Sequence, residues 1–278
     1  MFVIMSVWES IIYGLLSGLA EFLPVSARGH QSILMHLFGM DHRNPVCDLF
    51  VHIGIIAALF FSCRGLFVRL RRELYVASRR RRTRAYTHNG VYEIRMIKSA
   101  SFLVLVGSIL YFKTRAYESN PLLLTLFFAI NGLIIIIPEY IRRGNKSAKH
   151  MTGFDGILFG LFSILSVFPG ISRIASGMGI LSVRGADVHH YQNWILLLSI
   201  PALLVFTIFD FIHIFTFGLG SVTLLAVVGW FIASITAFIG AYLGITFYRL
   251  LCKKRSFAGF AYYSWGAAMF TFVLYLIA

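Results

Sequence analysis

The sequence predicts an all-α polytopic membrane protein, and three observations carry that prediction. Of the 278 residues, 58% are hydrophobic and only 13% are charged, which is too apolar for a water-soluble domain of this length. Several apolar runs are long enough to cross a hydrocarbon core about 30 Å thick. Two further runs are each interrupted near their middle by proline and glycine beside polar residues. The chain is therefore expected to contain both continuous and broken membrane segments.

Continuous spans are expected where the apolar runs are uninterrupted. These runs are residues 46–63, 121–141, 191–217, 221–251 and 258–278, with Ile97 to Phe112 as a shorter sixth candidate. The interrupted runs, residues 7–38 and 154–185, are each expected to form a re-entrant hairpin of two half-helices. Irregular backbone survives at membrane depth only where protein buries it or where it lines a wet cavity. The expected architecture is six transmembrane helices plus two re-entrant helix hairpins.

Three basic blocks constrain the topology. Residues 64–84 carry nine arginines and one acid; the second block is Arg142, Arg143, Lys146 and Lys149, and the third is Arg249, Lys253, Lys254 and Arg255. All three are expected in the cytoplasm, where they face anionic membrane lipids. They share a side only if run 154–185 returns to the face from which it enters. The same count places Arg43 and Glu118 outside.

The chain then divides into two similar halves, residues 1–145 and 146–278, within one integral membrane domain. Each half is a broken hairpin followed by three spans, and an odd number of spans inverts the second half relative to the first. The glycine pairs at 14 and 18 and at 156 and 160 also echo each other, although glycines at this spacing by themselves indicate only close helix packing. Inverted repeats place the ligand site near the midplane, where broken helix ends meet.

Charge and cysteine content exclude other classes. The net charge of +14 is confined to short blocks between apolar runs, so nucleic acid is not an expected partner. Cys47, Cys63 and Cys252 lack metal-ligand spacing and indicate neither a disulfide framework nor a zinc site.

The polar residues at the two interruptions are suited to binding an anion. Helix N-termini attract phosphate oxygens, and a guanidinium group binds them through two parallel hydrogen bonds. The phosphate-binding candidates are Ser26, Arg28, Ser172 and Ser176.

Three ionisable residues at the same interruptions are the catalytic candidates: Glu21, His30 and Arg173. Arg173 can clamp a phosphate group. His30 can exchange protons near neutral pH or attack phosphorus, and Glu21 can orient His30 or help to hold a divalent cation. Such residues suit the hydrolysis of a phosphoanhydride, which depends mainly on positioning and charge neutralisation.

Four segments carry a family resemblance: Gly18-Leu-Ala-Glu21-Phe-Leu-Pro-Val-Ser26-x-x-Gly29-His30, Asp48-Leu-Phe-Val-His-Ile-Gly54, Phe168-Pro-Gly-Ile-Ser172-Arg173 and Leu196-Leu-Leu-Ser-Ile-Pro201. Over nearly its whole length the chain resembles the bacitracin-resistance family of undecaprenyl pyrophosphate phosphatases. The resemblance implies a bacterial inner-membrane enzyme, assisted by Mg²⁺ or Ca²⁺, that removes the terminal phosphate of a polyprenyl diphosphate. By the same resemblance, the enzyme is expected to recycle the carrier lipid of peptidoglycan synthesis. A site opening toward the outer face is expected, and a homodimer is left open.

The chain departs from the family pattern at three places. Ser17 stands where family members usually have a second acid, and Ala27 stands where they have a hydroxyl that is a proposed nucleophile. Ile174 and Ala175 replace the usual Ser-Gly after Arg173. Three interpretations are left open: a divergent phosphatase in which His30 acts directly with water and metal, a catalytically impaired homologue that binds or translocates polyprenyl phosphate, and, more distantly, a transporter of a small anion.

Overall fold

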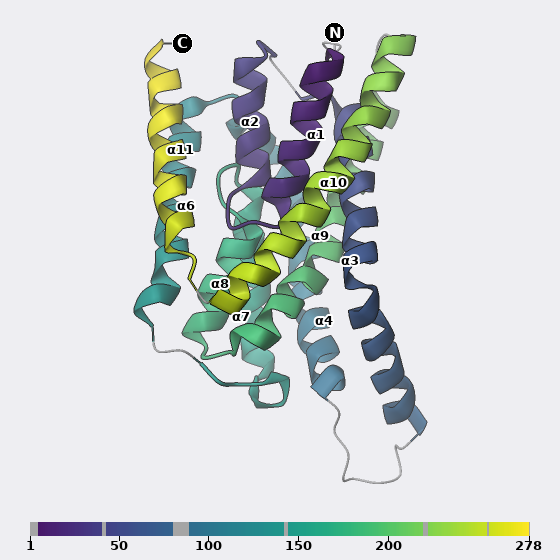
Figure 1. Ribbon diagram of the computed structural model, residues 1–278, viewed down its shortest axis with the longest axis vertical. Coiled ribbons are helices and arrows are strands. Elements are labelled where there is room, and N and C mark those ends of the chain that lie inside the picture. The colour runs from purple at the N-terminus through teal and green to yellow at the C-terminus, as the bar shows by residue number, and fades with distance from the viewer. Residues whose placement is uncertain are drawn as a thin grey trace.

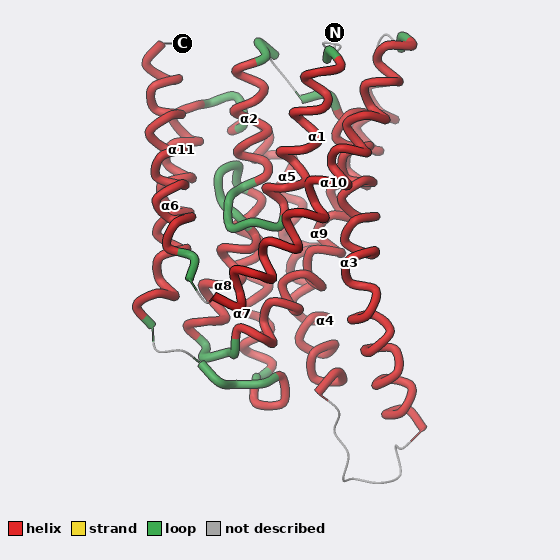
Figure 2. Tube along the Cα trace, in the orientation of Figure 1, coloured by secondary structure: helices red, strands yellow, loops and turns green. Residues whose placement is uncertain are grey.

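The computed structural model describes residues 5–40, 43–79, 89–141, 144–218, 222–254 and 256–277. Within them the chain is helical, and Figure 2 shows helices and loops without a strand. The helices, labelled in Figure 1, are α1 (Val7–Glu21), α2 (Ala27–Leu37), α3 (Pro45–Arg79), α4 (Asn89–Gly107), η1 (Ser108–Leu110), α5 (Tyr111–Thr114), η2 (Arg115–Tyr117), α6 (Pro121–Tyr140), η3 (Ala148–His150), α7 (Gly153–Ile164), η4 (Leu165–Val167), α8 (Arg173–Val183), α9 (Val188–Phe217), α10 (Leu224–Lys254) and α11 (Ala258–Ile277).

Five of the described helices are long and apolar enough to span a membrane, so this is an integral membrane protein. They are Pro45–Val76 of α3, Pro121–Tyr140 of α6, Val188–Thr216 of α9, Leu224–Lys254 of α10 and Ala258–Ile277 of α11. The sixth expected span, Ile97 to Phe112, is not one continuous helix. It begins inside α4, whose first half carries Glu93, Arg95 and Lys98, and it continues through η1 into α5.

The two interrupted runs each form a pair of short helices. At 15 and 11 residues, α1 and α2 are about 22 and about 16 Å long, which is less than the membrane core. Both lie toward the end of the molecule that carries the two chain termini, whereas α7 and α8 lie toward the opposite end (Figure 1). The C-terminal ends of α3 and α6 point to that opposite end as well.

Close packing ties each short pair to the other half of the chain. Helix α1 packs mainly on α10, and α7 packs mainly on α4. A Cβ at Gly14 would lie 2.2 Å from the Ala233 carbonyl oxygen, and a Cβ at Gly18 would lie 2.2 Å from that of Ala237. These glycines are therefore required for backbone contact, as the packing interpretation of their spacing expects.

The remaining contacts repeat this exchange between halves. Helix α3 packs on α10 while α9 packs on α4, and the pairs α3–α9 and α6–α11 also join residues 1–145 to residues 146–278. The halves thus interleave around one core instead of folding side by side.

Parts of the basic blocks lie outside the described residues, namely residues 80–84, 142–143 and 255. Within the described parts, Lys146 at the second block and Lys253 and Lys254 at the third are exposed.

Candidate functional site

The first helix break is built from Phe22 to Ser26. Pro24 cannot donate a backbone hydrogen bond and disfavours helical geometry in the residue before it, so α1 ends at Glu21. Ser26 then caps α2, because its Oγ accepts a hydrogen bond from the Gly29 amide at 3.1 Å. Glu21 and Arg28 are thereby held at the two helix ends that flank the break.

The second break, between η4 and α8, has the same design. Gly170 adopts φ +110°, a conformation that favours glycine, and a Cβ there would also lie 2.7 Å from the Phe127 Cβ. Ser172 caps α8 by accepting from the Ala175 amide at 3.3 Å. Arg173 is therefore the first residue of its helix.

Hydrogen bonds between the two breaks hold them together. The Gly170 amide donates to the Ser26 Oγ at 3.0 Å, and the Ser172 Oγ donates to the Leu23 carbonyl at 3.1 Å. Because the Ser26 Oγ already accepts from two amides, its own hydroxyl proton remains free to donate to a ligand. Ser26 and Ser172, both expected at the phosphate site, thus also have a structural role.

Asn131 of α6 bridges the two breaks and was not anticipated from the sequence. Its side-chain nitrogen donates to the Pro24 carbonyl at 3.0 Å, and its side-chain oxygen accepts from the Ser172 amide at 2.8 Å. The residue is fully buried. The sequence feature that could have indicated this role is a lone amide side chain within the apolar run 121–141, since a polar side chain at membrane depth needs partners.

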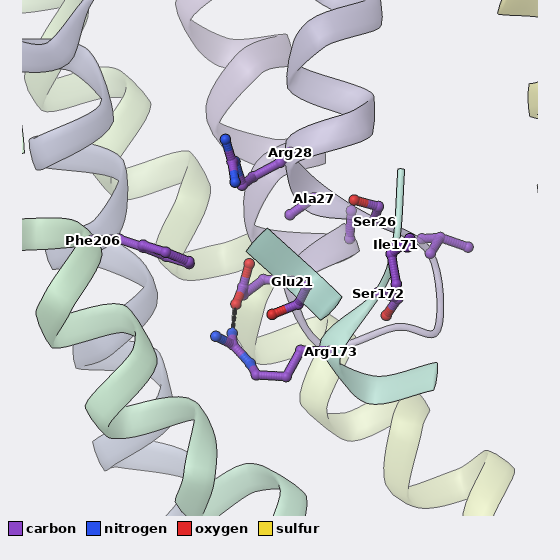
Figure 3. A pocket seen from close by; sticks show the side chains of 11 residues that line it. Glu21, Ser26, Ala27, Arg28, Ile171, Ser172, Arg173 and Phe206 are labelled. Atoms are coloured by element: carbon purple, nitrogen blue, oxygen red, sulfur yellow. Dashed lines mark hydrogen bonds and ion pairs between the residues drawn. The ribbon is translucent and has the colours of Figure 1, made fainter. Parts of the chain in front are cut away.

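A small cavity of about 20 Å³ lies where the breaks meet, and its lining includes Glu21, Ser26, Ala27, Ser172 and Arg173. Figure 3 shows the carboxylate of Glu21 facing the guanidinium of Arg173, with which it forms an ion pair across the two halves. The Arg173 Nε is buried and has no hydrogen-bond partner among the described residues. The cavity has room for about one water molecule, so a phosphate group can enter only if the ion pair opens.

Arg28 also lines this cavity, but its guanidinium is held elsewhere. Its Nε donates to Glu118 at 3.1 Å, its two terminal nitrogens donate to Glu118 and to the Val167 carbonyl, and its Cζ lies 4.6 Å from the centre of the Tyr111 ring. In Figure 3 it points away from the Glu21–Arg173 pair.

His30 does not line the cavity, and in the described part of the chain its ring nitrogens contact other residues than Glu21. Its Nδ1 lies 2.7 Å from the Ser26 carbonyl oxygen, and its Nε2 lies 2.6 Å from the Tyr263 hydroxyl. A carbonyl can only accept, so Nδ1 carries the proton and the lone pair is on Nε2. The tautomer suits a base or nucleophile, although in this structure Tyr263 occupies that lone pair.

The other candidate positions differ in their surroundings. Ala27 places a methyl group at the cavity, at the first position of α2 (Figure 3). Ser176 is buried and does not line the cavity, and its Oγ has no hydrogen-bond partner among the described residues. Ser17 accepts from the Gln31 side chain at 3.1 Å, so the position of the family's second acid contacts α2.

A buried network of charges joins the loops expected outside. Arg43 donates to Glu118 at 2.8 Å and to the Gln31 side chain at 2.7 Å, and it lies 3.3 Å from Asp48. Arg43 and Glu118 are only 2% and 3% exposed. Burial by itself would raise the pKa of Glu118, but Arg43 and Arg28 outweigh it and lower that pKa below its ordinary value.

Replacing Glu118 by glutamine is expected to destabilise the protein at neutral pH, because Arg28 and Arg43 lose their shared carboxylate. Breaking a buried pair in this way typically costs about 3–5 kcal/mol. A lowered folded-state pKa means that the carboxylate stabilises the protein above its ordinary pKa of 4.5 and that this contribution is lost as pH falls through the lower folded value.

Thermal unfolding of wild type and Glu118→Gln in detergent should therefore differ strongly at pH 7 and progressively less below pH about 4.5. If the difference in unfolding temperature between wild type and variant were the same at pH 7 and well below pH about 4.5, the assignment of Glu118 as the central carboxylate would be contradicted.

Glu21 is the one carboxylate, in the described part of the chain, that lines the cavity between the two helix breaks. Nor do the described residues bring three or more His, Cys, Asp or Glu side chains together as a metal cluster. Mg²⁺ is commonly bound through one or two carboxylates plus substrate phosphates. The residues present thus fit a cation that arrives with a phosphorylated substrate, held by Glu21, better than one caged by protein alone.

Comparison with known proteins agrees with the resemblance of the motifs. The family described as bacitracin resistance protein BacA matches residues 10–270. An undecaprenyl-diphosphatase of Alkaliphilus metalliredigens (strain QYMF) is 27% identical over 270 residues, covering 94% of this chain and 96% of that protein. Undecaprenyl-diphosphatase 1 of Shouchella clausii (strain KSM-K16) is 29% identical over 97% of this chain and 96% of its own. An undecaprenyl-diphosphatase of Treponema denticola (strain ATCC 35405 / DSM 14222 / CIP 103919 / JCM 8153 / KCTC 15104) is 30% identical over 93% of this chain and 94% of its own.

Proposed function

The chain belongs to the bacitracin resistance protein BacA family, and from this premise we propose that it is a divergent undecaprenyl-diphosphatase of the bacterial inner membrane. Its substrate is a polyprenyl diphosphate. Hydrolysis breaks the phosphoanhydride bond and releases inorganic phosphate and the polyprenyl monophosphate, which returns to peptidoglycan synthesis as carrier lipid.

One observation carries the proposal beyond family membership. Arg173 and Glu21, which are 152 residues apart, form an ion pair in a cavity where two broken helices meet inside an apolar protein. Ionisable groups at membrane depth are expensive and mark functional sites. The unpartnered Nε of Arg173 and the free proton of Ser26 supply donors for phosphate oxygens.

Within this proposal the residues have the following roles. The substrate phosphate displaces Glu21 from Arg173 and takes its place against the guanidinium group and the Ser26 hydroxyl. The released Glu21 carboxylate is then available to hold a divalent cation, which when bound neutralises charge on the phosphates. His30 offers its Nε2 lone pair to the terminal phosphorus, or to an attacking water, once the Tyr263 hydroxyl has left it.

The finer architecture belongs to the same proposal: six spans and two re-entrant hairpins, inverted between residues 1–145 and 146–278. The exchange of contacts, α1 with α10 against α7 with α4, favours it. In this arrangement the end carrying the basic blocks is cytoplasmic, and the α1–α2 hairpin enters from outside.

Cysteine labelling of intact cells tests this orientation. Ser119 and Lys146 are both exposed, while the native Cys47, Cys63 and Cys252 are buried. An impermeant thiol reagent should label Ser119→Cys and spare Lys146→Cys until the membrane is permeabilised. Labelling of position 146 with protection of position 119 would refute the proposed topology.

A second candidate function, binding or translocation of polyprenyl phosphate without cleavage, is favoured by the methyl group of Ala27 at the cavity. The variant Ala27→Ser separates the two. If hydrolysis already proceeds through His30, a hydroxyl at the start of α2 adds a second route, and phosphate release should rise by about tenfold.

The control Ala27→Val adds bulk without a hydroxyl and should not raise activity. If the wild type releases no phosphate but binds polyprenyl phosphate, the non-catalytic function is favoured. If neither hydrolysis nor lipid binding occurs, both functions are excluded.

A further inference from the structure

A second cavity, of about 490 Å³, lies between α3, α9 and α10 on the side of the basic blocks. Its lining includes Arg69 of α3, Asn193 of α9, and Arg249 and Lys253 of α10. This volume is within the range of small-molecule sites. It shares no lining residue with the Glu21–Arg173 cavity.

The charge of this cavity is positive after its ion pairs are counted. Arg69 is balanced by Glu93 at 2.6 Å and by Glu73 at 3.6 Å. Arg249 and Lys253, in contrast, have no carboxylate partner among the described residues. The two terminal nitrogens of Arg249 donate to the Ser62 carbonyl at 3.1 Å each, which leaves its Nε for another acceptor.

Two features of α3 leave the cavity receptive. The hydroxyl of Ser62, a lining residue, is buried and has no hydrogen-bond partner in the described part of the chain. A Cβ built on Gly65 would meet no atom within 4 Å, so space is open above this turn of the helix. Hydrogen-bond donors that lack acceptors and lie beside open space are expected where an anionic ligand binds.

The position of the cavity indicates that the anion is attached to a lipid. Lys253 lies in the last turn of α10, so the cavity lies at a membrane interface, where basic pockets between helices bind lipid headgroups. Phe61 and Phe247 are exposed and precede the cavity residues on α3 and α10. Since both helices run toward the basic end, these apolar side chains lie on the membrane side of the cavity, where a lipid tail would run.

We propose that this cavity binds the phosphate headgroup of an anionic lipid, held by Arg249, Lys253 and the Ser62 hydroxyl. The ligand is a phosphate ester on an apolar chain, of which an anionic phospholipid and a polyprenyl monophosphate are the two sources. The inference goes beyond the proposed function and does not depend on catalysis at the other cavity.

Binding can be measured by native mass spectrometry of the purified full-length chain in detergent. Dioleoyl phosphatidylglycerol, undecaprenyl phosphate and inorganic phosphate are added separately, with zwitterionic dioleoyl phosphatidylcholine as reference. The wild type should retain one or both anionic lipids over phosphatidylcholine, and the better retained of the two identifies the source. Displacement of bound lipid by inorganic phosphate at equal concentration would overturn the lipid assignment.

Paired variants make the test specific to the cavity. The double substitution Arg249→Gln with Lys253→Gln should lower retention about tenfold, whereas Lys254→Gln, an equal charge change at the next position, should not. Gly65→Phe fills the cavity without altering charge and should lower retention as well. The substitution should not weaken the helix itself, because glycine is the poorest residue for a helix interior apart from proline. Wild-type retention in both cavity variants would overturn the proposal. Because bound lipid is the readout, that failure would leave the phosphatase proposal intact.

Discussion

Arg173→Lys is expected to lower phosphate release from a polyprenyl diphosphate by about 10²- to 10³-fold, the usual effect of removing one preorganised donor. Arginine offers a planar pair of donors, and the buried Nε is the donor left without a partner in the structure. Lysine keeps the charge but cannot reproduce two parallel hydrogen bonds to phosphate. The loss should therefore appear in turnover and in lipid-phosphate binding together.

Arg184→Lys is the matched control for this variant. Arg184 lies at the other end of the same helix and pairs with Asp155, so the same chemical change there should alter turnover only slightly. Wild-type turnover and lipid affinity in Arg173→Lys would remove Arg173 from the site.

His30→Ala is expected to lower turnover by about 10³-fold or more, as the loss of a nucleophile or base does. If the lone pair on Nε2 is the reactive group, alanine removes it while Arg173 and Ser26 still bind lipid phosphate. Lipid binding should therefore persist when turnover is lost, in contrast to Arg173→Lys.

His36→Ala provides the comparison, because His36 is on the same helix and its Nδ1 likewise contacts a backbone carbonyl, that of Ser32 at 2.8 Å. Its loss should leave turnover within a few-fold of the wild type. Persistent turnover in His30→Ala would mean that His30 only joins α2 to Tyr263 of α11.

The helix breaks were predictable from the sequence because their causes are local. Proline, glycine and a capping serine determine backbone geometry within a few residues, so the breaks before Ser26 and before Ser172 follow from the order of residues. The joint location of Glu21 and Arg173 agrees with the expectation that broken helix ends of an inverted repeat meet near the midplane, because the two side chains form an ion pair.

The partners of the polar side chains were not predictable in the same way. Arg28 was expected at a phosphate, but it pairs with Glu118, which is 90 residues away. His30 turns toward Tyr263, which is 233 residues away. Such contacts depend on how α2 is rotated about its own axis. The periodicity of hydrophobic residues does not determine this rotation for a helix that protein surrounds on most sides.

The sixth expected span shows a different limit. The run from Ile97 to Phe112 is apolar, yet α4 starts at Asn89 and ends at Gly107, so the boundaries of the apolar run and of the helix do not coincide. Polar residues Glu93, Arg95 and Lys98 belong to the same helix, where Glu93 is buried and paired with Arg69. Composition alone could not show that this charge is neutralised.

The most direct test of the account is phosphate release by the purified wild-type chain from undecaprenyl diphosphate, with and without Mg²⁺ or Ca²⁺, beside the variant Glu21→Gln. We expect release of one phosphate per diphosphate, no release from undecaprenyl monophosphate, stimulation by divalent cation, and a loss of that stimulation in Glu21→Gln. Absence of phosphate release by the wild type under every cation condition would contradict it.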